Sequence, residues 1–337
     1  MEPLRSGKAS SELLARLLAE LPPSPPEVRL GPAVGEDACA IQLHDDLLVA
    51  AADPVTLTAQ ELGTLSVVVN ANDVAVTGAR PRWFLAVILL PPGSTAETVR
   101  SLFSAVADAV EAIGAHLVGG HTEVTAAVTR PVVVGQMLGL AEGGRLLTTG
   151  GAAPGEVIVQ VGPVPLEGAA VLARESADRL DGLDPVLVEA ARACLEDPGI
   201  SVVEPALLAA RLGATALHDP TEGGLAVGLQ ELARASDVRL EIDPAAVLWF
   251  EPGCAVCKAL GAAPWSTLAS GSLLATFPAA VAGKALAALR EQGYPAAAIG
   301  TTAVGTGVHD LSGHPLRSSG RDEVARVLAV SPEGSTG

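Results

Sequence analysis

The sequence contains few cysteines, and this scarcity narrows the class of protein. Four cysteines occur among 337 residues, at positions 39, 194, 254 and 257. Such sparse use excludes a disulfide framework and is typical of a cytoplasmic chain. Cys254 and Cys257 form one C-x-x-C, but no second pair or matching histidines lie nearby, as a zinc site usually requires. We therefore interpret this pair as reduced and structural, with a redox role as the alternative.

Apolar stretches long enough to cross a membrane are also absent. The densest run, WFLAVILLPP from Trp83, is too short for a membrane span and ends in prolines. The first twenty residues mix acidic and basic side chains, which is not the layout of a signal peptide. The sequence therefore predicts a chain without a membrane segment.

Positive charge is scarce as well. The chain has 21 lysines and arginines against 38 acidic residues, which gives a formal net charge of −17. Sequence-independent binding to nucleic acid and attachment to an anionic membrane both rely on a basic surface, so we exclude both. An anionic small substrate would need a metal ion or a local group of hydrogen-bond donors.

The composition that remains is globular, since 49% of the residues are hydrophobic. The chain is long enough for two domains, and strand and helix patterns alternate on both sides of a glycine-rich stretch around residues 143–156. We predict an α/β or α+β fold in four parts. These are a helix with a Pro-rich connector over residues 1–30, an N-terminal domain over 31–148, a C-terminal domain over 149–328 and a loose tail over 329–337.

The stretch VVVNANDVAVTGARP, residues 67–81, places polar side chains inside an apolar helical pattern. Asn70, Asp73 and Thr77 lie three and four positions apart, so a helix from about Ala59 to Thr77 puts them in one row. An unpartnered buried carboxylate is costly. The pattern therefore indicates either a ligand such as a metal ion or a satisfied polar network in the core. The residues alone leave both interpretations open.

Four segments of the first half carry polar side chains beside glycines, prolines or strand ends. Carboxylates at strand ends suit magnesium, which typically takes one or two of them together with phosphate oxygens. Each residue alone is better explained by a turn or a helix cap, and only the set makes a metal site competitive. The segments are VGEDACA with Glu36 and Asp37, AADPVT with Asp53, the helix above with Asn72 and Asp73, and LVGGHTEVT, in which a loop with His121 and Glu123 follows a strand.

In the second half, HDPTEGGLAVGLQELARAS predicts a strand, a glycine-rich turn and a helix. Backbone amides at such a helix start can hold a phosphate, here near Thr221, Gly223 and Gly224. The alternative is an ordinary turn in which Thr221 caps the helix.

Lys8 is open to two similar interpretations, as a phosphate ligand or a solvated side chain. His121 and His218 each suit a base, a ligand or a turn residue, and the sequence does not choose among these roles.

The order of the motifs resembles that of one family. GEDACAI, AADPVTL, NDVAVTGARP, LVGGHTEVT, HDPTEGGLA, LASGSLLATF and IGTTAVGTGV are similar to the motifs of the AIR synthase-related (PurM-like) ATP-dependent enzymes, and most similar to its HypE-like members. The resemblance covers residues 30 to 308. It implies a two-domain PurM-like fold. The first domain is a mixed sheet with helices that pairs with its copy into a barrel, giving a homodimer, and the second is an α/β sandwich.

The same resemblance implies ATP and Mg²⁺ as cofactors. The metal ligands it implies are Asp37, Asp53 and Asp73. The nucleotide contacts it implies are Asn72, Asp73, Gly119, Gly120, Thr221, Gly223 and Gly224. The catalytic candidates are His121, Glu123 and Asp219. His121 stands where relatives often carry an acidic residue, and we expect Glu123 to substitute for it.

The function implied is ATP- and magnesium-dependent phosphorylation or activation of an oxygen on a small or protein-borne substrate. HypE-like members carry the activated group on a C-terminal cysteine, whereas the last cysteine of this sequence is Cys257. The segment VGPVPLEGAA also lacks their Gly-Asp-His-Gly run. We therefore expect no transfer to a thiol of the tail. Two alternatives remain, a thiamine-monophosphate kinase and a nucleotide-binding regulatory module without turnover.

Overall fold

The computed structural model describes residues 11–56, 61–141, 144–316 and 321–329. The expectations for Lys8, for the loose tail beyond residue 329 and for the start of the predicted helix at Ala59 lie outside these residues. The described chain forms two compact units. We call residues 21–147 and 201–207 the N-terminal unit, and the rest of the described chain the C-terminal unit.

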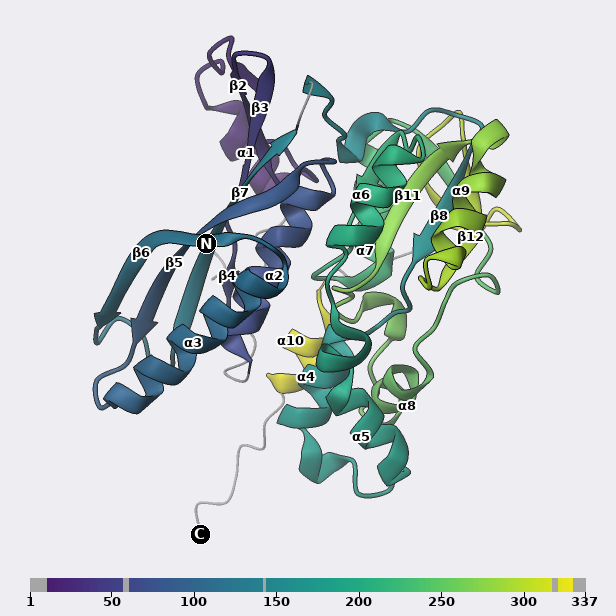
Figure 1. The fold of residues 1–337 in the computed structure, drawn as a ribbon. Coiled ribbons are helices and arrows are strands. Elements are labelled where there is room, and N and C mark those ends of the chain that lie inside the picture. Colours follow the sequence, from purple (N-terminus) through teal and green to yellow (C-terminus); the bar gives the residue numbers. More distant parts are fainter. Residues whose placement is uncertain (1–10, 57–60, 142–143, 317–320, 330–337) are drawn as a thin grey trace. The chain divides into compact units, whose positions relative to one another are not determined.

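The N-terminal unit is built on one mixed sheet, with helices on one face (Figure 1). Its strand order is β1-β2-β3-β7-β5-β6, with β4 also paired to β7. The β5–β6 pair is parallel and the other described pairs are antiparallel. The strands are β1 (Val28–Leu30), β2 (Cys39–Leu43), β3 (Asp46–Ala51), β4 (Pro54–Val55), β5 (Arg80–Leu90), β6 (His116–Val124) and β7 (Val132–Ala141).

Two helices cover this sheet, and both follow from sequence signals. Helix α2 (Leu62–Ala75) packs on β7, β3 and β5 and is buried on nearly all sides. Helix α3 (Ala96–Ala112) packs against α2. Thr95 caps α3 by accepting the Thr98 N–H at 3.1 Å, and Gly114 follows its end in the left-handed conformation.

Strand β6 extends further than the sequence predicted. His121 and Glu123 were expected in a loop after a strand, but they lie inside β6, opposite Val87 and Leu89 of β5. The parallel pairing with β5 therefore sets the length of this strand. Gly120 makes the pairing possible, because its φ is 145° and a Cβ there would lie 2.0 Å from the Ala86 carbonyl oxygen.

The C-terminal unit contains a second mixed sheet, in the order β13-β10-β12-β8-β11-β9. Its strands are β8 (Glu156–Val161), β9 (Ala216–His218), β10 (Arg239–Ile242), β11 (Leu273–Pro278), β12 (Ala296–Ala303) and β13 (Gly307–Asp310). The two mixed sheets with their helices confirm the predicted α/β architecture. Helix α7 (Gly224–Ala235) buries Leu225, Leu229 and Leu232 in a core that includes residues of β8, β10 and β11.

The remaining described helices are short. They are α1 (Ser11–Ala19), α4 (Glu167–Glu175), α5 (Pro185–Ala193), α6 (Val203–Arg211), α8 (Glu251–Ala259), α9 (Ala279–Glu291) and α10 (Glu323–Leu328). Helices α4, α5 and α8 pack on one another, and α10 packs on α4. None of the helices in the described ranges is both long and apolar enough to cross a membrane.

The core of the N-terminal unit gives a first prediction. Phe84 of β5 is fully buried, whereas Phe103 of α3 is 50% exposed. We expect Phe84→Ala to lower the free energy of unfolding by about 3–5 kcal/mol, because it leaves a cavity in a packed core. Chemical denaturation measures the change. Phe103→Ala is the matched control, and an equal loss in both variants would contradict the packing described here.

Candidate functional site

Asp53 lies in a short break between β3 and β4. Ala51 pairs with Met137 and Pro54 pairs with Val134, so both strands keep one register along β7. The Asp53 N–H donates to Asn70 Oδ1 at 2.8 Å, and the Asp53 carbonyl accepts from Asn70 Nδ2 at 3.1 Å. The residue itself is exposed. Asp53 is therefore an exposed acidic residue whose backbone is hydrogen-bonded to Asn70 of helix α2.

A glycine at position 135 leaves room for this arrangement. The Gly135 N–H donates to the Asp53 carbonyl at 3.0 Å. A Cβ at this position would lie 2.4 Å from Asn70 Nδ2 and 2.7 Å from the Ser66 carbonyl oxygen, closer than real Cβ atoms approach their neighbours. Any larger residue would push the Asn70 amide away from Asp53.

The other polar residues of α2 have partners inside the N-terminal unit. Asn72 Oδ1 accepts the Val202 N–H at 2.8 Å, and Thr77 Oγ1 donates to the Val74 carbonyl at 2.7 Å. Both residues are buried, so the core-network interpretation of this helix accounts for them. Asp73 is 5% exposed and lies one turn after Asn70.

The three predicted metal ligands all belong to the N-terminal unit. Asp37 is half-buried and precedes β2, Asp53 is exposed, and Asp73 lies on α2. No group of three or more histidine, cysteine or acidic side chains among the described residues is arranged to hold a metal ion. Magnesium needs no such cage, because one or two carboxylates with phosphate oxygens and waters suffice. The donor chemistry therefore fits magnesium, and the ligand set stays a prediction.

Strand β6 brings two catalytic candidates together. His121 Nε2 lies 3.3 Å from Glu123 Oε2, and the two side chains are 61% and 49% exposed. Alternation along a strand places residues i and i+2 on the same face, which explains the contact. An acid and an imidazole in hydrogen-bond reach on an exposed face are suited to moving a proton.

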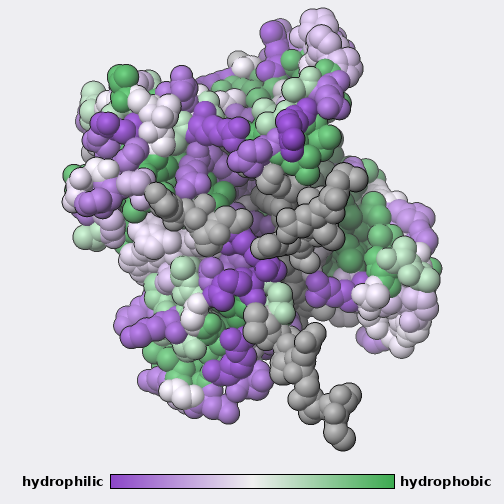
Figure 2. All heavy atoms as spheres, turned by 180° about the vertical axis from the view of Figure 1, so that it is seen from behind, coloured by the Kyte–Doolittle hydropathy of each residue, from purple (hydrophilic) through white to green (hydrophobic). Residues whose placement is uncertain are grey.

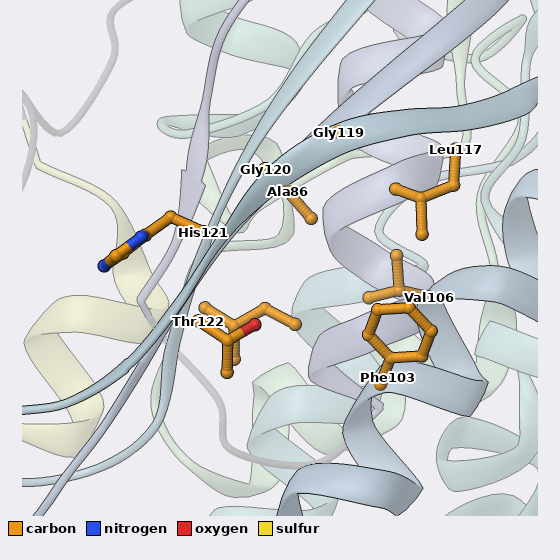
Figure 3. Close-up of a pocket in the computed structure, with 9 residues that line it drawn as sticks. Ala86, Phe103, Val106, Leu117, Gly119, Gly120, His121 and Thr122 are labelled. Carbon is orange, nitrogen blue, oxygen red and sulfur yellow. The ribbon is translucent and has the colours of Figure 1, made fainter.

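A cavity of about 350 Å³ lies between β5, β6 and α3. Figure 3 shows Phe103, Val106 and Leu117 on one side of β6 and the His121 ring on the other. The predicted contacts Gly119 and Gly120 contribute backbone to its wall. The full lining is Ala86, Ile88, Phe103, Val106, Leu117, Gly119, Gly120, His121 and Thr122.

The glycine-rich turn of the C-terminal unit differs from the alternative in which Thr221 caps the helix. Helix α7 begins at Gly224, and its N-cap is Gly223 in the left-handed conformation, with no side-chain cap. The Gly223 N–H donates to Asp322 Oδ2 at 2.7 Å. An internal carboxylate therefore lies at the helix start where a phosphate was predicted. A left-handed residue cannot be read from the position of a threonine, which is why the cap was misplaced.

Buried carboxyl groups surround this turn. The pKa of Glu167 is raised to about 7, mainly by burial. A hydrogen bond with Ser270 acts against this shift, and the nearby charges of Asp322 and Glu222 add to it. Burial also raises the pKa of Asp322 to about 6, although the Gly223 N–H bond opposes the shift. The structure reveals this acidic group, which the sequence did not indicate.

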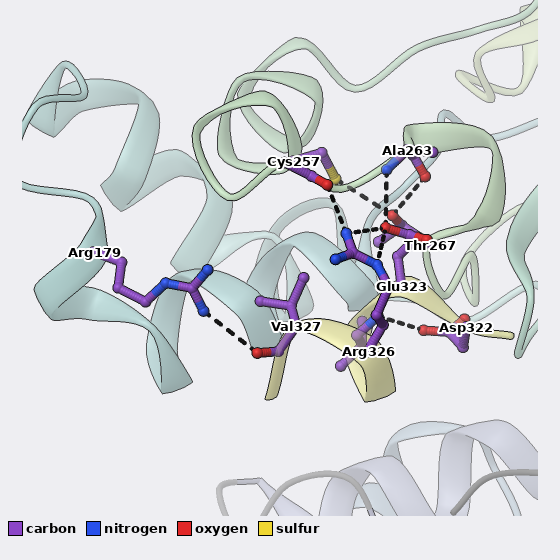
Figure 4. Close-up of polar contacts among 10 residues, drawn as sticks. Arg179, Cys257, Ala263, Thr267, Asp322, Glu323, Arg326 and Val327 are labelled. Carbon is purple, nitrogen blue, oxygen red and sulfur yellow. Dashed lines mark hydrogen bonds and ion pairs between the residues drawn. The ribbon is translucent and has the colours of Figure 1, made fainter. Parts of the chain in front are cut away.

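Asp322 lies at the N-cap of helix α10. Asp322 caps α10 by accepting the Val324 N–H at 2.7 Å. Glu323 accepts the Ala263 N–H at 3.2 Å and Arg326 Nε at 2.9 Å, as Figure 4 shows. Arg179 donates to the Val327 carbonyl at 3.3 Å. Hydrogen bonds therefore join both ends of this six-residue helix to other parts of the C-terminal unit.

His218 ends strand β9 in a buried position, and Asp219 follows it. His218 Nε2 lies 3.1 Å from Glu231 Oε2, and its Nδ1 lies 3.4 Å from Thr149 Oγ1. His218 and Asp219 are 1% and 2% exposed. Since this chain of hydrogen bonds is buried, it holds the strand end in place. Thr149 and Glu231 were not found from the sequence, because only the fold brings them to His218.

The C-x-x-C pair lies on helix α8 as two free thiols. Burial raises the pKa of Cys257 to about 12, and burial also raises the pKa of Cys254. A thiol must ionise before it attacks a disulfide or binds a metal. Burial therefore disfavours the reactive thiolate form of both residues at neutral pH, and the reduced, structural role stays a prediction.

Family descriptions match most of the chain. "AIR synthase related protein, N-terminal domain" matches residues 35–141, and "AIR synthase related protein, C-terminal domain" matches residues 153–310. The chain therefore belongs to the AIR synthase-related (PurM-like) family, as the order of its motifs predicted.

Similar sequences among curated proteins include HypE and a kinase. Carbamoyl dehydratase HypE of Cupriavidus necator is 30% identical over 72% of this chain and 66% of that protein. The HypE of Azotobacter vinelandii is 30% identical over 79% of this chain and 78% of its own length. Thiamine-monophosphate kinase of Corynebacterium glutamicum is 32% identical over 64% of this chain and 63% of that enzyme.

Solved structures share the fold. Hydrogenase maturation protein HypE in complex with ATP matches with a TM-score of 0.70 and 25% identity, over 96% of this chain and 98% of that one. A HypE–HypF complex matches with a TM-score of 0.70 and 22% identity over 86% and 94%. AaThiL complexed with AMPPCP and TMP matches with a TM-score of 0.71 and 18% identity over 91% and 93%. The last two likenesses show the fold alone.

The buried carboxyl of Glu167 gives a prediction about pH. Its pKa is raised from 4.5 to about 7 on folding, so between these values the folded chain holds a proton that the unfolded chain has released. Stability is therefore greatest below pH 4.5 for this group and is lost as the pH rises to 7. We expect Glu167→Gln to be more stable than the parent chain by roughly 3 kcal/mol at pH 8 and equal to it at pH 4.

Urea denaturation at a series of pH values measures this difference. Glu189→Gln is the control, because the Glu189 side chain is 74% exposed. Its difference from the parent chain should not change with pH. Parallel stability curves for Glu167→Gln and the parent chain would show that Glu167 does not titrate in the way described.

Proposed function

We propose that this chain is an ATP- and magnesium-dependent enzyme that phosphorylates or activates an oxygen of a small or protein-borne substrate. The observation that carries the proposal is the break between β3 and β4. There the exposed residue Asp53 is held by the helix that also carries Asp73, inside the region matched by the family's N-terminal domain. Fixed acidic groups in this setting suit a metal–phosphate complex.

The proposal assigns roles to five of the candidate residues and keeps the others as predictions. Asp53 and Asp73 would hold magnesium, and Asp37 would complete the set. When bound, the metal neutralises charge on the phosphate chain. The His121–Glu123 pair would accept the proton of the attacking oxygen, since the two side chains lie 3.3 Å apart and are exposed. Asn72, Gly119, Gly120, Thr221, Gly223 and Gly224 stay predicted nucleotide contacts, and Asp219 stays a catalytic candidate.

Two classes of acceptor oxygen are compatible with the relatives. The similarity to HypE favours activation of a protein-borne group. We place this first because three HypE proteins and the hydrogenase expression/formation protein HupE match the chain at 29–31% identity. The 32% identity to a thiamine-monophosphate kinase favours a small phosphate acceptor as the second candidate. Release of ADP with a small acceptor but without any protein would favour the kinase.

Substitution of the three aspartates tests the metal site. We expect Asp37→Asn, Asp53→Asn and Asp73→Asn each to weaken magnesium-ATP binding by about 10-fold or more, because each removes a charge that faces the metal complex. Isothermal titration calorimetry measures the affinity. Asp108→Asn, on the exposed face of α3, is the matched control. Unchanged affinity in all three variants would remove the site assignment.

We further propose that two chains form a homodimer through the sheet of the N-terminal unit. Strand β6 is at the edge of that sheet, and Val118 and Val124 on it are 55% and 54% exposed. Figure 2, seen from behind, shows hydrophobic side chains at the surface on the side of this sheet. An exposed edge strand with apolar side chains favours pairing with another chain.

Sedimentation velocity tests the dimer. We expect a dimer at micromolar concentration, and we expect Val118→Lys to shift the protein toward the monomer because a charge would be placed in an apolar contact. Val304→Lys is the control, since Val304 is 81% exposed and lies in the C-terminal unit. A monomeric parent chain under the same conditions would contradict the proposal.

A further inference from the structure

The amide of Asn70 uses its hydrogen-bonding groups on two neighbours. Its Oδ1 accepts the Asp53 N–H at 2.8 Å. Its Nδ2 donates to the Asp53 carbonyl at 3.1 Å and to the Ser66 carbonyl at 2.8 Å. A primary amide has two N–H donors, and both are engaged here. Because the donors face carbonyls and the acceptor faces an N–H, only one orientation of the amide satisfies all three contacts.

These contacts replace a missing section of the sheet ladder. Strand β3 ends at Ala51 and β4 begins at Pro54, which has no N–H to donate. Between them, the Asp53 N–H has its partner in a side chain of α2, and its carbonyl also accepts the Gly135 N–H at 3.0 Å. Asp53 is therefore fixed from the helix and from β7, although it lies in a break of its own strand.

We propose that Asn70 is a positioning residue that sets the place of the Asp53 carboxylate relative to Asp73, one turn further along the same helix. The inference rests on the proposed function, in which these two carboxylates bind the magnesium-ATP complex. Asn70 is fully buried, so it acts through Asp53 rather than by contact with the metal complex.

The physical reason is the geometry that magnesium demands. Magnesium accepts oxygen ligands only within a narrow, near-octahedral arrangement, so a small displacement of one carboxylate weakens binding. Groups that orient a ligand without touching the metal typically change metal affinity by about 10- to 100-fold. Loss of the Asn70 contacts would release the backbone of an exposed two-residue break. The Asp53 carboxylate would then have to be ordered when the magnesium-ATP complex binds, at a cost in binding free energy.

A purely structural role for Asn70 makes a different prediction from a positioning role. A change at Ser66, a neighbour on α2, distinguishes these two roles. Ser66 is also fully buried, and its Oγ donates to the Gly63 carbonyl at 2.8 Å. Its side chain has no part in the contacts to Asp53. If α2 needed buried polar groups only for stability, Ser66→Ala and a change at Asn70 would act alike. If Asn70 positions Asp53, only the change at Asn70 weakens the binding of magnesium-ATP.

The experiment compares Asn70→Ala, Asn70→Ser, Asp53→Asn, Ser66→Ala and the double variant N70S/D53N. Asn70→Ser guards against a failure to fold, because a serine in a helix can bond the carbonyl four residues earlier, here that of Ser66. It is too short to keep the contacts to Asp53. Hydrogen exchange reports on the Asp53 amide without any ligand. Calorimetry with magnesium-ATP, at several magnesium concentrations, reports on the site.

We expect Asn70→Ser to remove the protection of the Asp53 amide and to weaken magnesium-ATP binding by about 10- to 100-fold. The half-saturating magnesium concentration should rise accordingly. In the Asp53→Asn background the same change should cost less than about 2-fold, because residues that act as one unit are not additive. Ser66→Ala should leave both the exchange and the affinity unchanged.

Three results would overturn the inference. These are retained protection of the Asp53 amide in Asn70→Ser, unchanged affinity despite lost protection, and an equal loss of affinity with and without the Asp53 carboxylate. A different result removes the proposed function itself, namely a parent chain that does not bind magnesium-ATP or an Asp53→Asn variant that binds as tightly. In that case the positioning role falls with it, while hydrogen exchange still shows whether Asn70 fixes the Asp53 backbone.

Discussion

One buried side-chain amide, that of Asn70, joins the helix α2 to a break in the sheet of the N-terminal unit. Through it the helix supplies hydrogen bonds that the ladder between β3, β4 and β7 lacks at Asp53. Several features depend on this contact. Position 135 must be glycine, since a side chain there would collide with the amide. The register of β3 and β4 along β7 must be continuous, so that Asp53 and Gly135 meet.

The acidic residues of this chain occupy two contrasting environments. In the N-terminal unit, Asp53 is exposed, and its backbone is held by Asn70. In the C-terminal unit, Glu167 and Asp322 are buried together, and burial raises the pKa of both groups. The exposed carboxyl group lies where a cation is proposed to bind. The buried carboxyl groups lie where the polypeptide itself packs, at a cost in stability above neutral pH.

Local signals in the sequence predicted the elements, and contacts distant in sequence decided the site. The sequence offered Ser94 or Thr95 as the cap of α3 and Gly114 as its end, and the structure uses Thr95 and Gly114. The ordered motifs indicated the family. Strand β6 was too short in the prediction because its length follows from its pairing with β5. Asn70 was recognised as part of a polar row, but its partner lies 17 residues away in a strand break. No local pattern reveals such a partner.

The contact between Gly223 and Asp322 also bears on how any external anion would meet helix α7. The two residues are 99 positions apart in one chain, so the carboxylate is a tethered ligand for the helix start. Tethering gives such a group an effective local concentration of about millimolar or higher. A free phosphate of similar intrinsic affinity would have to exceed that concentration to occupy the same amide. The helix start therefore favours its own carboxylate over dilute free anions, and a nucleotide phosphate that used the Gly223 amide would have to displace Asp322.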